Sequence, residues 1–234
     1  MKNRLSNWVH SLFAILSGAG LLVADPSAKP PPVRVEYAHG DPKSTCQNYL
    51  EAVKRADLDA ALKCWEYRKE DSAAMNVVVG IWIAHRRLNQ AVANKFKAKE
   101  SLNILDGWLR DDLTDEAIAL TEKLLLSAKA EYKGDNAILD MKWQDVDTSE
   151  TCFRFPEQPT LRKIGGSWKM SVSGENDVLE KGTWGPLIRD TMNFLNEAAD
   201  KVNKGEFKTV IELKKFLDTK EKAMETRYDR DTQK

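Results

Sequence analysis

The sequence is poor in the residues on which most enzyme sites are built. Its 234 residues include only three cysteines and three histidines, and His10 lies in an N-terminal segment that we expect to be removed. No two cysteines have the spacing of metal ligands. No Gly-x-Ser-x-Gly, phosphate-binding loop or dinucleotide fingerprint occurs. We therefore expect no metal and no cofactor, and the sequence carries no catalytic motif.

The chain also lacks an excess of charge of either sign. It has 36 basic and 36 acidic residues, a net charge of zero and a pI of about 6.8. A nucleic-acid partner is usually met by a basic face or a pI above about 9. The composition therefore argues against nucleic-acid binding. The apolar fraction of 42% is enough for one substantial core.

The N-terminus holds the one long apolar run. Lys2 and Arg4 precede an apolar stretch from Trp8 to Val23, which ends in small residues before Asp25. This is the pattern of a secretory signal, and the run is shorter than the ~20 residues of a membrane span. We assign residues 1–24 to a signal peptide and predict an exported protein, periplasmic or extracellular. Whether the segment is cleaved or kept as an anchor stays open.

A proline-rich linker is predicted at residues 25–40, and folding begins after it. Asp41 and Pro42 form a good helix start, with an N-cap carboxylate followed by proline. Asp57 caps a second short helix over residues 58–65. Apolar residues at helical spacing predict a long helix over 73–96, which places Arg86 and Asn89 largely off the apolar stripe. A further short helix begins near residues 114–116.

The apolar period then changes from 3.6 to 2, beginning at Leu126. This alternation predicts a curved antiparallel sheet of four to five strands, with turns at Gly134-Asp135 and Gly165-Gly166. The face covered by helices is predicted to consist of Ala128, Ala130, Tyr132, Leu139, Met141, Trp143, Phe153, Phe155, Trp168, Met170 and Val172.

Two C-terminal helices are predicted within residues 185–227. Pro186 opens the first, which ends near Gly205, and Thr209 and Glu212 have capping-box spacing for the second. Residues 228–234 form a charged, frayed tail. The fold class is thus α+β, with one domain over residues 41–227.

The order of elements resembles the nuclear-transport-factor-two-like superfamily, the cystatin-like α+β cone, and a secreted bacterial member of it in particular. The likeness lies in two segments, 56–62 (ADLDAAL) and 161–170 (LRKIGGSWKM), and covers roughly residues 41–173. It implies a conical cavity between helices and sheet. It implies no single function, since members include isomerases, dehydratases, polyketide cyclases and domains that only bind.

The predicted covered face of the sheet contains no carboxylate and no histidine. His85, within the apolar stripe of the long helix, is the remaining candidate for proton transfer. A buried neutral histidine bonded to a neighbour is the alternative interpretation. Regularly spaced aromatics either form the core or stack on a flat ligand. The candidate ligand-binding residues are Trp82, His85, Tyr132, Trp143 and Phe155.

Cys46 and Cys64 lie in consecutive predicted helices, and an exported chain can form disulfides. They form a candidate disulfide if they face each other. Small buried thiols are the alternative, because free cysteine is a common core residue.

Three function classes follow. The first is a non-catalytic module that binds an apolar small molecule or a protein partner in the helix-sheet cavity. The second is a cavity enzyme of the isomerase or dehydratase type that uses His85. The third is a structural or assembly protein with a filled core, which interacts through its C-terminal helices. An apolar cavity of roughly 300 Å³ or more favours the first, and an acid beside His85 favours the second.

Overall fold

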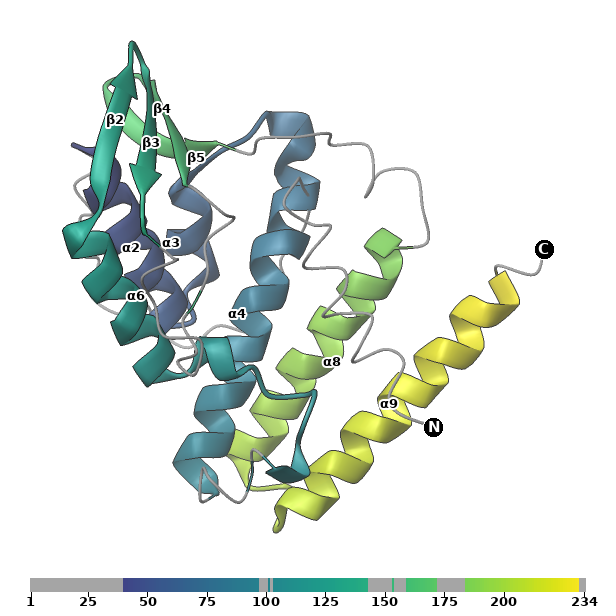
Figure 1. Ribbon diagram of the computed structural model, residues 1–234. Helices are drawn as coiled ribbons and strands as arrows, with labels where there is room; N and C mark the ends of the chain where they lie inside the picture. The colour runs from purple at the N-terminus through teal and green to yellow at the C-terminus, as the bar shows by residue number, and fades with distance from the viewer. Residues whose placement is uncertain are drawn as a thin grey trace.

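The computed structural model describes residues 40–96, 101, 103–142, 153, 159–171 and 184–231. Trp143, Phe155 and Val172 lie outside these residues, as do the predicted signal peptide and the linker up to residue 39. The fold is α+β, as predicted: helices pack beneath one face of a small sheet and continue away from it as a separate helical layer (Figure 1).

Helices α2 (Pro42–Lys54) and α3 (Leu58–Lys63) begin at the predicted caps. The Asp41 carboxylate accepts the Ser44 N–H at 3.0 Å, and the Asp57 carboxylate accepts the Ala60 N–H at 3.0 Å. Each cap satisfies one of the backbone donors that a helix start leaves unpaired. Local sequence is therefore sufficient to define where both helices begin.

The long helix α4 (Ser72–Lys95), preceded by the 3-10 turn η1 (Lys69–Asp71), confirms the predicted apolar helix. It lies between the two packed regions of the molecule and supplies side chains to both (Figure 1). Arg86 and Asn89, predicted off the packing stripe, are buried, with 3% and 7% exposure. The prediction for them is wrong because α4 is covered on several sides, and a helix buried this way has no fully wet face.

Helix α6 (Asp115–Ser127) follows the 3-10 turn η2 (Asp111–Leu113) and is capped by Thr114, whose hydroxyl accepts the Ala117 N–H at 3.2 Å. The sequence predicted that alternation begins at Leu126. Instead the helix continues through Ser127, and Leu126 is 66% exposed. The next strand, β2 (Lys129–Lys133), starts two residues after the helix ends.

The sheet has the order β1-β5-β4-β3-β2. Its strands are β1 (Trp65–Glu66), β2 (Lys129–Lys133), β3 (Asn136–Asp140), β4 (Thr160–Ile164) and β5 (Ser167–Ser171). The four later strands pair antiparallel, as predicted. β1 pairs with β5 in parallel, with Trp65 opposite Met170, so the sheet is mixed and the all-antiparallel prediction is wrong. The predicted helix over residues 58–65 is also wrong at its end, because α3 stops at Lys63 and Trp65 begins β1. A strand of two residues carries no alternation from which it could be predicted.

The face of the sheet toward the helices carries the first core. Leu139, Leu161 and Met170 are at most 2% exposed and pack with residues of α2, α3, α4 and α6. Phe153, also 2% exposed, is in contact with the Tyr49 and Trp82 rings, with centroids 6.2 and 5.6 Å away. Among the described residues, side chains from helices and sheet thus pack against one another across the space between them.

The second core lies between α4, α8 (Trp184–Lys204), α9 (Val210–Asp231) and the segment 105–109. α4 and α8 approach closely at Gly80, where an added Cβ would lie 2.5 Å from the Met192 sulfur. The Thr209–Glu212 capping box is confirmed, with the Glu212 N–H donating to Thr209 Oγ1 at 3.2 Å. α9 continues to Asp231, past its predicted end at residue 227, so the first residues of the predicted tail are helical.

Candidate functional site

A row of polar side chains on α4 binds the backbone of the segment that follows it. His85 Nδ1 lies 3.2 Å from the Trp108 carbonyl oxygen, and since a carbonyl only accepts, the proton of this bond is on Nδ1. Asn89 donates to the Arg110 carbonyl at 2.6 Å and accepts from the Arg110 N–H at 3.2 Å. His85 is 3% exposed. This geometry is that of a buried histidine that holds a loop, which was the alternative interpretation of His85.

Arg86 extends this row toward α2. Its guanidinium donates to the Lys54 carbonyl at 3.2 Å from both Nε and Nη2, and to the Leu113 carbonyl at 2.9 Å. Nη2 also donates to the Asp115 carboxylate. Gln90 adds a second donor to Lys54, at 2.7 Å. One buried cation therefore joins the end of α2 and the start of α6 to α4, a role that the sequence analysis missed.

Trp82 contacts a second arginine, Arg110, which is partly buried. The Arg110 guanidinium carbon lies 4.5 Å from the centre of the Trp82 ring, and its fork binds the Asp112 carboxylate at 2.8 and 2.7 Å. The side chains of Arg110 and Asp112 are 10% and 19% exposed. The Trp82 ring thus contacts the Arg110 cation and the Phe153 ring, which occupy the surfaces that a flat ligand would need for stacking. Trp82 is a packing residue here.

Tyr132, the third candidate, is not on a covered surface. It lies on the edge strand β2 and is 58% exposed, with its ring 5.7 Å from that of Trp168. It is on the predicted face of the sheet, but no helix covers that face at its edge. The structure therefore brings Trp82 and His85 together on α4 and separates Tyr132 from them.

Cys46 and Cys64 are free thiols, and both are fully buried, so the candidate disulfide is not present in this structure. Burial raises the pKa of Cys64 to about 12 and also raises the pKa of Cys46, where the neighbouring Cys64 adds to the effect. A thiol reacts as the thiolate. These cysteines are thus core residues with little reactivity at neutral pH.

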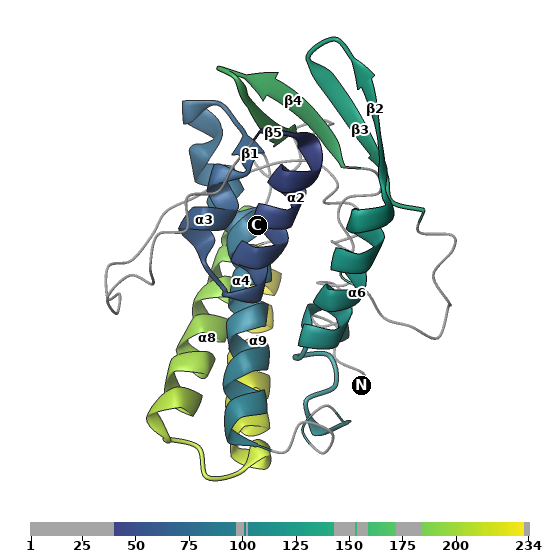
Figure 2. The same ribbon diagram turned by 90° about the vertical axis from the view of Figure 1, so that its left-hand side faces the viewer.

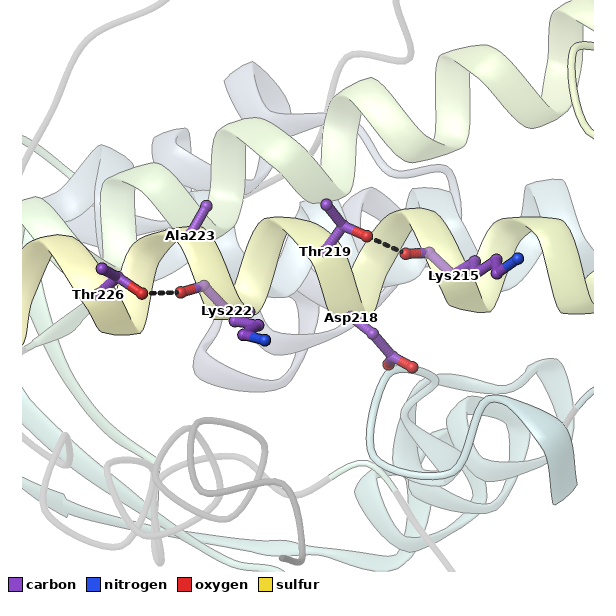
Figure 3. A pocket seen from close by; sticks show the side chains of 6 residues that line it. All are labelled: Lys215, Asp218, Thr219, Lys222, Ala223 and Thr226. Atoms are coloured by element: carbon purple, nitrogen blue, oxygen red, sulfur yellow. Dashed lines mark hydrogen bonds between the residues drawn. The ribbon is translucent and has the colours of Figure 1, made fainter.

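One pocket lined wholly by described residues lies on the outer side of α9, away from the helix-sheet core (Figure 3). It is an open groove of about 430 Å³. The Thr219 hydroxyl donates to the Lys215 carbonyl at 2.6 Å, and the Thr226 hydroxyl donates to the Lys222 carbonyl at 2.8 Å. Its lining residues, which we call the α9 groove, are Lys215, Asp218, Thr219, Lys222, Ala223 and Thr226.

The two threonines direct their hydroxyl protons back to the helix, which leaves their methyl groups and that of Ala223 for the floor of the groove. Asp218 is held at one side by Lys214 at 2.6 Å and by the Trp108 indole N–H at 3.2 Å. The α9 groove is therefore a shallow apolar surface with lysines at its margin.

Within the described ranges, no group of three or more histidine, cysteine, aspartate or glutamate side chains could hold a metal ion. Among the described helices, none has an apolar stretch long enough to cross a bilayer. No family model, curated protein or solved structure matches the chain. The likeness to the α+β cone superfamily accordingly stays a prediction from sequence.

Proposed function

We propose that this protein is an exported, non-catalytic binding protein that acts through its surface, with another polypeptide as its partner. The observation that carries the proposal is the groove on the outside of α9, an open surface lined wholly by described residues. Among the residues that the structure describes between helices and sheet, side chains such as Leu139, Leu161 and Phe153 are packed and buried. This arrangement favours the assembly class, in which the C-terminal helices form the interaction surface.

The chemistry of the α9 groove suggests the kind of partner. Three methyl groups along one helix face let another backbone approach closely. Lys215 and Lys222 are exposed at its margin, and neither pairs with a carboxylate among the described residues. A segment with small apolar side chains and flanking acidic residues would complement both features. We therefore propose an acidic, amphipathic segment of a partner protein.

The other two classes have less support. An apolar small-molecule module needs an open hollow where the first core is packed, since ligand sites are concave and bury most of the ligand. An enzyme that uses His85 needs the imidazole to face a substrate, whereas its Nδ1 holds the Trp108 carbonyl. The packed first core and the buried imidazole of His85 thus favour neither small-molecule binding nor catalysis.

The test is native mass spectrometry of the protein purified from its exported compartment, which reports bound small molecules and protein partners together. We expect a polypeptide partner. Ala223→Arg, at an exposed position in the groove floor, should abolish the complex. Ile211→Arg adds the same charge at an exposed position on the same helix outside the groove and should retain it.

A protein that purifies alone, or with an apolar small molecule, would contradict the proposal. So would an Ala223→Arg variant that keeps its partner. Circular dichroism and the urea midpoint should be unchanged in both variants, because both side chains point to solvent.

A further inference from the structure

The two hairpin turns of the sheet lie together at one end of the molecule, at the top of Figures 1 and 2. The Lys163 N–H donates to the Asp135 carbonyl at 2.7 Å, which joins the β2-β3 turn to the end of β4. Gly134, Gly165 and Gly166 form the turns with positive φ, and nothing lies within 4 Å of where their Cβ atoms would be. We call this end, residues 132–136 and 162–169, the sheet tip.

Basic side chains gather at the sheet tip. The strand register places Lys133, Asn136, Arg162 and Lys169 in one row across the outer face. Arg162 and Lys169 are directly opposite each other, and like charges in such a pair are unfavourable. Lys163 adds a cation from the other face. Three acids are nearby: Glu66, 3.4 Å from Arg162, Asp135 in the turn, and Glu131, two residues before Lys133 on the same face. Four cations against three acids leave the tip with a small excess of positive charge.

Two of these cations are available to a partner. Lys133 and Lys163 are exposed, and neither forms an ion pair with a carboxylate in the described part of the chain. Lys169 donates to the Lys63 carbonyl and keeps its charge. An excess of exposed cations at one end, in a chain with no net charge, is a local feature of the surface.

Exposed apolar side chains occupy the same end. Tyr132 is 58% exposed and Ile164 is 41% exposed, and they are two of the four large apolar residues that are exposed in the described ranges. Tyrosine is favoured at a boundary between apolar and aqueous phases because its ring is apolar and its hydroxyl is polar. The combination of cations and apolar side chains is typical of surfaces that lie on anionic bilayers.

We infer that the sheet tip docks onto the surface of an anionic phospholipid bilayer. The tip takes its residues from both faces of the sheet: Tyr132 and Lys163 from the side toward the helices, and Lys133, Arg162 and Ile164 from the outer side. A peptide lying along one face would meet only half of them. A planar boundary met end-on contacts both sets, and the bare glycine turns allow a close approach.

This inference is independent of the polypeptide partner proposed above. The α9 groove lies on a different layer of the molecule, away from the sheet (Figure 1). A protein docked through its tip would therefore leave the groove accessible. The failure of one proposal has no bearing on the other.

The test is co-sedimentation of the full chain with vesicles of one part phosphatidylglycerol to two parts phosphatidylcholine, and with phosphatidylcholine alone. A lysine near an anionic surface contributes roughly fivefold in partitioning. The double variant Lys133→Gln/Lys163→Gln should therefore bind the anionic vesicles about 25-fold more weakly. Ile164→Ser should also weaken binding, by roughly fivefold or more.

The matched control is Lys215→Gln/Lys222→Gln, which removes the same charge from α9 and should leave vesicle binding unchanged. Because the N-terminal apolar segment is common to all variants, a difference between them reports on the tip. Equal losses in the two double variants, or no preference for anionic vesicles, would overturn the inference. So would binding to soluble polyglutamate in the absence of vesicle binding, which would indicate an acidic protein partner.

Discussion

Arg86 is the buried cation that joins α2, α4 and the start of α6, and its replacement by methionine tests this part of the fold. The side chain is 4% exposed and donates to the Lys54 and Leu113 carbonyls and to the Asp115 carboxylate. Methionine keeps most of the volume and all of the apolar contacts but removes every donor. The variant therefore isolates the hydrogen bonds of the guanidinium.

The magnitude follows from what each partner loses. The Leu113 carbonyl loses its charged donor, and such bonds contribute roughly 1.5–3 kcal/mol. The Lys54 carbonyl retains Gln90, so its loss is smaller. The Asp115 side chain is 72% exposed and returns to water at little cost. We expect Arg86→Met to lower the free energy of unfolding by about 2–4 kcal/mol.

Asp115→Asn is the control, because it removes only the exposed partner. It should cost less than about 1 kcal/mol, as surface ion pairs do. The assay is equilibrium unfolding in urea followed by tryptophan fluorescence, where a shifted midpoint at constant slope reports a change in stability. If Arg86→Met changes stability by less than about 0.5 kcal/mol, or if Asp115→Asn costs as much, the bonds to the buried carbonyls are not what matters.

Three other predictions concern buried side chains. The raised pKa of Cys64 and Cys46 means that the unfolded chain releases these protons first as pH rises. The free energy of unfolding should therefore not depend on these thiols below about pH 9, and above it should fall by up to about 1.4 kcal/mol per thiol per pH unit. The measurement is the urea midpoint as a function of pH, and the same fall with pH in the Cys46→Ala/Cys64→Ala variant would contradict the prediction. At the contact of α4 with α8, Met192→Ala should cost about 0.5 kcal/mol less in a Gly80→Ala background, and additive costs in a double-mutant cycle would show that the two residues do not touch. His85→Ala should cost roughly 1–3 kcal/mol and His85→Gln less; equal midpoint shifts would show that the bond to the loop is unimportant.

The helix starts were predictable because their causes are local. Asp41, Asp57, Thr114 and the Thr209–Glu212 pair each bond to a backbone N–H within three residues, so short sequence is enough to identify them. The paired turns at 134–135 and 165–166 have the same origin, since glycine accepts the positive φ that they require. The prediction was wrong where helical and strand patterns overlap. Leu126 fits the apolar alternation of the strand that follows, but it lies in the last turn of α6.

The candidate site was less predictable, because burial depends on residues distant in sequence. Tyr132 has the correct face, but its exposure depends on β2 being the sheet edge. His85 was identified from its position in an apolar stripe, whereas its partner, the Trp108 carbonyl, comes from an irregular segment with no pattern to predict it. Arg86 lies in a polar run of the helix, between His85 and Arg87, so the sequence held no signal that its guanidinium would be buried against carbonyls.

Apart from β1, the sequence by itself determined the order of the described helices and strands, the caps that begin the helices and the balance of charge, because capping, turn formation and periodicity act over a few residues. Only the tertiary structure decided that β1 joins the sheet in parallel, that Arg86 is buried against two carbonyls and that the open groove lies outside α9. These features depend on which segments, distant in sequence, pack together and bury apolar surface. The free energy of that burial depends on both segments and cannot be read from either one alone.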